Sequence, residues 1–437
     1  MWCGETRRAA GGEAAGSQVL AAETAAGHAF VASGAAVTAR AQTATGSVLT
    51  GELTAVGQRA ARDKLATALG PVGWAVAVYC VSRLILLVVA GIVAVAGRHA
   101  FGPEFFTYDG GWYLRLAEHG YPARALHAKS TLGFFPLYSL AIRAVMDATF
   151  LSAPQAALII SFLGGLAAAV GVQRLATSWW GEQAGRRATV VFCLFPGSIV
   201  FSMAYSECLA IPLALGCLIA LRSHHWWRAG LCAGLATAVE PVSLVLIPAC
   251  LIAAAAQLRQ HGWRDPRARR SLAAPLLAPF GIGAFAVFLW VWTGTPFAAY
   301  LAQHYGWHQQ GQPLALLALP VAHRLFGHPE QLTDYIFAWN VWNGVFGGIF
   351  LAWSIWELLR VRHELGRGVI ALAAGVAAVT LWSVMTPPNA RLVLIAFPAV
   401  MVWGRRLSGR TFGLFVLAEG LALVLMSMLT FSGQMLP

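Results

Sequence analysis

The segment TYDGGWYLRLAEHGYP places one acid, Asp109, just after the first long apolar run of this 437-residue chain. Gly110 and Gly111 follow it, and Trp112 and Tyr113 are close by in the sequence. A carboxylate at a boundary between membrane and water, surrounded by aromatic residues, suits the deprotonation of a hydroxyl group beside a lipid. Asp is also a favoured helix cap, and local chemistry leaves both interpretations open.

Three further charged residues stand in or beside apolar stretches. Glu207 ends the segment PGSIVFSMAYSE, and an acid between two spans with almost no loop is costly unless it is paired, functional or a cap on the next helix. Glu240 precedes Pro241, which indicates either a broken helix lining a wet cavity or a neutral, hydrogen-bonded acid. Arg391 follows MTPPNA, where a guanidinium can grip phosphate oxygens or extend to the lipid headgroups.

The composition indicates the kind of fold that must position these residues. Of the chain, 58% is hydrophobic and only 11% charged, against about 25% charged in a soluble domain. We therefore predict one all-α polytopic membrane domain over residues 73–437, preceded by a disordered or weakly ordered cytoplasmic tail over residues 1–72, which is rich in Ala, Gly and Thr.

The net charge of +12 does not indicate nucleic-acid binding, because Lys and Arg cluster in short runs between apolar stretches. The seven cysteines show no metal-ligand spacing, and six of them lie inside apolar runs. No cluster requires a metal cofactor, although a lone Mg²⁺ stays open because it needs only one or two carboxylates. Nucleotide-driven transport and zinc hydrolysis lack their usual motifs, GxxxxGK[ST] and HExxH.

About eleven transmembrane helices fit the apolar pattern: 73–97, 155–175, 188–204, 205–221, 229–242, 243–257, 273–293, 339–359, 368–385, 392–404 and 411–431. The short pieces 229–242 and 243–257 fit half-helices or one bent hairpin. With a cytoplasmic N-terminus, 22 of the 30 Lys and Arg residues fall inside and 7 outside, as the positive-inside rule requires. The stretch 133–150 then lies outside, as an interfacial helix in the first outer loop.

The motifs resemble those of a known family. YDGGWYLRLAEHGYP, followed by GFFPLYSL, is similar to the PIG-V family of GPI mannosyltransferases and its bacterial relatives, which belong to the GT-C class of glycosyltransferases. FPGSIVFSMAYSE also resembles a stretch of that family, through Pro196, Ser198, Ser202, Tyr205, Ser206 and Glu207. Tyr108 stands where the family usually has Trp, and Glu240-Pro241 where relatives often carry Arg and a small residue.

The resemblance implies an inverting mannosyltransferase that uses a polyprenyl-phosphate-mannose donor and the hydroxyl of a lipid-linked or cell-surface glycan. Asp109 would be the general base, and Arg391 and Lys129 would stabilise the departing phosphate. Glu207 and His119 would hold sugar hydroxyls. The other residues that we expect at the substrate are Trp112, Tyr113, Tyr121, Tyr138 and Tyr205. We expect a bacterial plasma membrane, with lipid around the helices and the active site on the outer face.

Two other functions stay open. A transporter or flippase of a lipid-linked sugar would use the same apolar groove, with Glu240 as a coupling acid. A non-catalytic scaffold of GT-C shape would hold a partner enzyme. The sequence shows no paired inverted repeat of the kind that transporters often have.

Overall fold

The computed structural model describes residues 70–308, 339–382 and 388–437, which belong to the compact unit Gly70–Pro437. Every regular element in these ranges is a helix, which confirms the predicted all-α fold class. The tail predicted over residues 1–72 lies outside the described residues, apart from its last three.

Five of the described helical segments are long and apolar enough to cross a membrane, so the multi-pass prediction is confirmed. They are Gly70–Gly97, α4 (Ala153–Trp180), the pair η4 (Pro241–Val245) and α8 (Leu246–His261), the run from Pro266 to Thr293, and α19 (Gly409–Phe431). A sixth is α5 (Glu182–Leu194) with η3 (Pro196–Ser202), if the two helices, bent by 74°, count as one span. The predicted number of eleven is not confirmed.

Most of the remaining apolar helices are too short to cross a membrane, and one is long enough but less apolar. These are α6 (Glu207–Arg222), α7 (Trp226–Ala236), α15 (Trp339–Arg360), α16 (Arg367–Trp382), α17 (Ala390–Ile395) and α18 (Phe397–Arg406). The run from Pro266 comprises α9 (Pro266–Arg269), η5 (Arg270–Leu272), α10 (Ala273–Leu277) and α11 (Phe280–Thr293). The short helices α12 (Ala298–Leu301) and η6 (Ala302–Gly306) follow, and η8 (Arg362–Glu364) joins α15 to α16.

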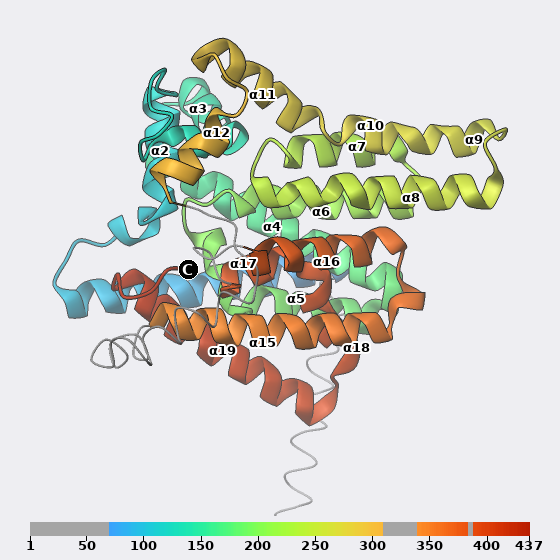
Figure 1. The fold of residues 1–437 in the computed structure, drawn as a ribbon. Helices are drawn as coiled ribbons and strands as arrows, with labels where there is room; N and C mark the ends of the chain where they lie inside the picture. The colour runs from blue at the N-terminus through green and yellow to red at the C-terminus, as the bar shows by residue number, and fades with distance from the viewer. Residues whose placement is uncertain (1–69, 309–338, 383–387) are drawn as a thin grey trace, which may run out of the picture. The chain divides into compact units, whose positions relative to one another are not determined.

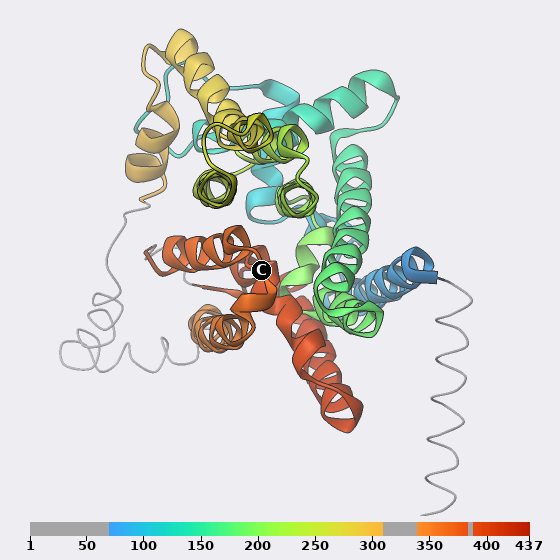
Figure 2. The ribbon, with the colours of Figure 1, turned by 90° about the vertical axis from the view of Figure 1, so that its right-hand side faces the viewer.

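Figures 1 and 2 show how these helices are grouped within the unit. Helices α6, α7, α8 and α10 pack together on one side, and α15, α16, α18 and α19 form the other. Contacts between α8 and α16 join the two groups directly, and α4 and α5 join them by a second route, because α4 packs against α6 and α5 packs against α18. The loop between α8 and α9 and the loop between α15 and α16 both lie at the ends of the helices that are remote from α2 (Figure 1).

The first predicted outer loop folds into four short helices: η1 (Pro103–Phe106), α2 (Asp109–His119), η2 (Thr131–Gly133) and α3 (Pro136–Ala148). Pro136 opens α3, as Pro commonly does at the first helical position. Tyr138 and Ile142 are buried on one face of α3, while Leu140 is exposed on the other. An interfacial position for this helix stays a prediction, although its one-sided burial suits it.

The break between α5 and η3 is held by an arginine from the first described helix. Pro196 has no backbone N–H and cannot continue the helix. The guanidinium of Arg83, which is buried, donates to the acceptors that the break leaves: the Ser198 carbonyl (2.6 Å) and hydroxyl (2.9 Å), the Ser202 hydroxyl (3.1 Å) and the Cys193 carbonyl (3.2 Å). Arg83 therefore replaces hydrogen bonds that an unbroken helix would form within itself.

The bent segment η3 in turn supports α17. A Cβ atom on Gly197 would overlap the carbonyl oxygen of Ala390, so the two backbones touch where only glycine fits. Met203 and Ala204 then lead from η3 into α6, and the Ala204 N–H donates to the Phe105 carbonyl of η1 (3.0 Å). One bent segment thus fixes the starts of α2, α6 and α17 relative to each other.

We predict that Arg83→Met lowers the melting temperature of the purified protein by several degrees. The substitution removes all four Arg83 hydrogen bonds, and although the Cys193 carbonyl keeps the Ser198 hydroxyl as a donor (2.8 Å), each buried acceptor left without a donor costs about 1–3 kcal/mol. The control is Arg98→Met, at an exposed position just past the end of the same helix. Equal melting temperatures for the two variants, measured by tryptophan fluorescence in detergent, would contradict the role of Arg83.

Candidate active site

Three helix starts converge on one point of the fold. Asp109 is the first residue of α2, Glu207 is the first residue of α6, and Arg391 is the second residue of α17. The start of a helix carries a partial positive charge and free N–H groups, so it favours the two carboxylates. The arrangement therefore gathers charged groups that lie far apart in the sequence.

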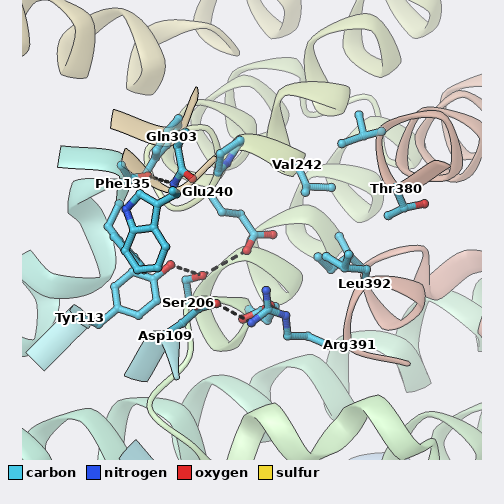
Figure 3. A pocket seen from close by; sticks show the side chains of 17 residues that line it. Asp109, Tyr113, Phe135, Ser206, Glu240, Val242, Gln303, Thr380, Arg391 and Leu392 are labelled. Atoms are coloured by element: carbon cyan, nitrogen blue, oxygen red, sulfur yellow. Dashed lines mark hydrogen bonds and ion pairs between the residues drawn. The ribbon is translucent and has the colours of Figure 1, made fainter. Parts of the chain in front are cut away.

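The guanidinium of Arg391 bridges the two acids, and Figure 3 shows its contact with Asp109. Its Nη1 donates to Oδ2 of Asp109 at 2.6 Å, and its Nε lies 3.1 Å from Oε1 of Glu207. The Tyr205 ring covers the guanidinium, with 5.1 Å between the ring centroid and Cζ. The side chain of Glu207 is 3% exposed and that of Asp109 is 33% exposed. Asp109 is thus the carboxylate that an entering molecule can reach most easily.

A second set of hydrogen bonds orients Glu240. The Tyr113 hydroxyl donates to Ser206 Oγ at 2.9 Å, and Ser206 Oγ donates to Oε2 of Glu240 at 3.2 Å (Figure 3). Burial, with a smaller contribution from the nearby Asp109 charge, raises the pKa of Tyr113 well above its usual range. Tyr113 therefore stays protonated and acts as a hydrogen-bond donor.

Two of the buried carboxylate oxygens that lack a hydrogen-bond partner within the described part of the chain belong to this site. They are Oε2 of Glu207 and Oε1 of Glu240, and both residues line the same pocket. A buried oxygen without a donor is costly, so such atoms mark places where a ligand's hydroxyl groups can bind.

The pocket around these groups has a volume of about 230 Å³ and two chemically different ends. Its polar end is formed by Asp109, Ser206, Glu207, Glu240 and Arg391. Its apolar end is formed by side chains of η4, α16 and α17, namely Val242, Val379, Leu392 and Ile395. The pocket therefore suits a molecule with a polar head and an apolar tail.

The structure separates the predicted substrate residues into three sets. Asp109, Tyr113, Glu207 and Arg391 line the pocket just described. A second pocket, of about 330 Å³, is lined by Trp112, His119, Tyr121 and Lys129. Tyr138 and Tyr205 are buried and line neither pocket: Tyr138 packs against the Tyr113 ring (centroids 5.1 Å apart), and Tyr205 covers Arg391.

Four residues that we did not predict as site residues also line the first pocket: Ser206, Glu240, Gln303 and Trp307. The Glu240-Pro241 pair and the motif residue Ser206 were visible in the sequence, and the predicted topology brought them to the same side of the membrane as Asp109, but it did not indicate a shared pocket. Trp307 lies in a segment rich in Tyr and His, residues 300–308, which we expected only to be an interfacial loop. Gln303 carried no signal, and its amide donates to the Gly133 carbonyl at 2.8 Å.

The described residues contain no group of three or more His, Cys, Asp or Glu arranged to hold a metal ion. The three acids of the first pocket are arranged around Arg391 instead, or bonded to Ser206. The need for Mg²⁺ stays untested.

Comparison with known families agrees with the motifs. Residues 75–265 match the model of the Mannosyltransferase (PIG-V) family. The match includes Asp109, Glu207 and Glu240, and it confirms the resemblance seen in the sequence. No curated protein matches the chain.

Among solved structures, the chain is similar to an oligosaccharyltransferase of Archaeoglobus fulgidus. The apo form is 14% identical, with a TM-score of 0.47 over 83% of this chain and 56% of that one. A second structure of that enzyme, in complex with an inhibitory peptide and a dolichol-phosphate, is 15% identical, with the same TM-score and coverage. The chain thus spans just over half the length of those proteins.

We predict that Arg391→Met destabilises the protein by about 3–5 kcal/mol, because it leaves Glu207 buried without its counter-charge. Adding Glu207→Gln should restore part of this loss, so the two substitutions are not additive. The control is Arg405→Met, which breaks the more exposed pair with Glu364 (3.0 Å) and should cost below about 1 kcal/mol. Strict additivity of the shifts in melting temperature would contradict the buried bridge.

Proposed function

We propose that the chain is a membrane mannosyltransferase that moves mannose from a polyprenyl-phosphate donor to a glycan hydroxyl, with Asp109 as general base. The family match supports a glycosyltransferase, and the membrane-capable helices support a site beside lipid. The observation that carries the proposal is the pairing of Asp109 with Arg391 in a pocket that is polar at one end and apolar at the other.

The proposed reaction is a single displacement with inversion at the anomeric carbon. Asp109 removes the proton of the acceptor hydroxyl while its oxygen forms a bond to that carbon. The bond between the anomeric carbon and the phosphate oxygen breaks, and its electron pair leaves with the polyprenyl phosphate. Arg391 is the cation in the pocket that can stabilise the charge on the departing phosphate.

In this scheme the guanidinium of Arg391 pairs either with the Asp109 carboxylate or with the phosphate of the bound donor. In the structure, the guanidinium donates to Asp109 at 2.6 Å. A phosphate entering the pocket competes for the guanidinium with its own oxygens, and a phosphate–guanidinium pair can be bidentate. The Asp109 carboxylate is then released to accept a proton only once the donor is bound.

The remaining parts of the pocket fit the other parts of the two substrates. Oε2 of Glu207 and Oε1 of Glu240 can accept hydrogen bonds from sugar hydroxyls. The apolar end at Val242, Val379 and Leu392 suits the first units of the prenyl chain. We place this pocket on the outer face of a bacterial plasma membrane, remote from the basic loops at the other end of the helices.

We predict that Asp109→Asn preserves folding but lowers transfer by about 10²–10⁴-fold, because an amide cannot take the proton. The assay measures polyprenyl phosphate released from radiolabelled donor in the presence of an acceptor. The control, Asp147→Asn, removes an exposed acid of α3 that pairs with Arg143 (3.0 Å). Normal turnover by the Asp109 variant would refute its role. Movement of the intact donor across a liposome membrane, without bond cleavage, would favour the flippase.

We also predict that Glu240→Ala raises the Michaelis constant for the sugar substrate about tenfold, through loss of the hydrogen bond between its carboxyl group and a sugar hydroxyl. The control is Glu419→Gln, which neutralises a buried acid of α19 that does not line the pocket. An unchanged Michaelis constant in the Glu240 variant, or an equal change in both variants, would argue against sugar binding by Glu240.

A further inference from the structure

The second pocket differs in charge from the first. It is lined by Trp112, Arg115, His119, Gly120, Tyr121, Pro122, Ala125, Lys129, Ser130 and Thr131. Arg115 and Lys129 are permanent cations, neither forms an ion pair with any described residue, and no carboxylate lines the pocket. Glu118, whose carboxylate lies 3.9 Å from the His119 ring, does not line the pocket. The first pocket contains three carboxylates and one guanidinium. The two pockets therefore favour ligands of different charge.

A layer of aromatic rings separates the two pockets. Phe134 and Trp307 line the first pocket, and Trp112 lines the second. The Trp112 ring stacks on Phe134 with 6.2 Å between centroids, and it meets the edge of Trp307 at 5.0 Å. The two pockets therefore lie on opposite sides of this layer of aromatic rings.

The same rings hold the cations of the second pocket. Lys129 Nζ lies 4.4 Å from the centroid of Trp307, and Arg115 Cζ lies 5.8 Å from that of Trp112. Attraction to the ring faces keeps both charges at the pocket without neutralising them. A bound anion can therefore still interact with two positive charges.

Helix α2 connects the proposed base to this pocket. Asp109, Trp112, Arg115 and His119 are spaced by three or four residues, so they follow one side of the helix. With a rise of about 1.5 Å per residue, Arg115 and His119 lie about 9 Å and 15 Å from Asp109 along the axis. A molecule lying along this side could place a hydroxyl at Asp109 and a negative group at Arg115.

We infer that the second pocket binds an anionic group of the acceptor, a phosphodiester or a carboxylate. The inference rests on the proposed function, because it assigns the first pocket to the donor. Arg115 and Lys129 are then specificity residues: they select acceptors with a negative charge one to three helical turns from the reacting hydroxyl. A neutral glycan would gain nothing from these two side chains.

The test compares binding of three probes by equilibrium dialysis, with the full-length protein in a neutral detergent. The probes are octyl mannoside, octyl mannoside bearing a methyl phosphodiester, and octyl mannoside bearing a carboxylate. We expect at least one charged probe to bind about tenfold more tightly than the neutral one, with an advantage that falls as salt is added. The charged probe that binds more tightly identifies the anion.

The variant Arg115→Gln/Lys129→Gln should abolish this advantage without changing the affinity for neutral octyl mannoside. Its control is Arg124→Gln, which removes an exposed cation of the same loop that does not line the pocket. Equal binding of charged and neutral probes by the unmodified protein, or an advantage that survives in the double variant, would overturn the inference.

The result does not depend on the assignment of Asp109. Binding requires no turnover, so the preference can also be measured in Asp109→Asn. If that variant kept normal transfer activity, the proposed base would be wrong while the anion preference could stand. If the preference were absent but Asp109→Asn were inactive, only the acceptor site would be wrong.

Discussion

The active-site region depends on one partly buried cation, the guanidinium of Arg391. It is only 16% exposed and contacts Asp109 and Glu207, two carboxylates that open different helices. Charges in a surrounding of low dielectric constant must be paired, because the cost of burying one alone is several kcal/mol. The starts of α2, α6 and α17 must therefore lie close together, so that these charges are paired. The same contact that satisfies Arg391 places Asp109 beside a pocket.

Broken helices make this meeting possible. A helix that crossed the membrane without interruption would place its ends at the two surfaces, whereas α5 breaks at Pro196 and the chain resumes at Glu207. Arg83 supplies the hydrogen bonds that the break removes, and Gly197 allows the bent segment to touch the start of α17. A second break, at Glu240-Pro241, brings another acid to the same pocket. The breaks are thus the means by which an apolar fold carries a polar site.

The sequence predicted the helical membrane fold and the charged residues of the site, because apolar runs and isolated charges are local signals. The predictions of Asp109, Glu207 and Arg391 as site residues rested largely on family motifs, and the structure places the three in contact. The sequence could not predict that Glu240 is connected to Tyr113 through Ser206, because such contacts depend on how the broken helices pack. For the same reason, Lys129 and His119 were expected beside Asp109 but line the neighbouring pocket. The number of spans was uncertain because short helices and bent pairs have the same hydropathy as full crossings.

In the proposed mechanism, Arg391 exchanges the carboxylate of Asp109 for the phosphate of a lipid donor. An experimental structure of the protein with polyprenyl phosphate bound tests this most directly. We expect the phosphate within hydrogen-bonding distance of Arg391, the prenyl chain against Val242 and Leu392, and Asp109 turned toward the space that the sugar would occupy. A phosphate bound elsewhere, with the contact between Arg391 and Asp109 intact, would contradict the account.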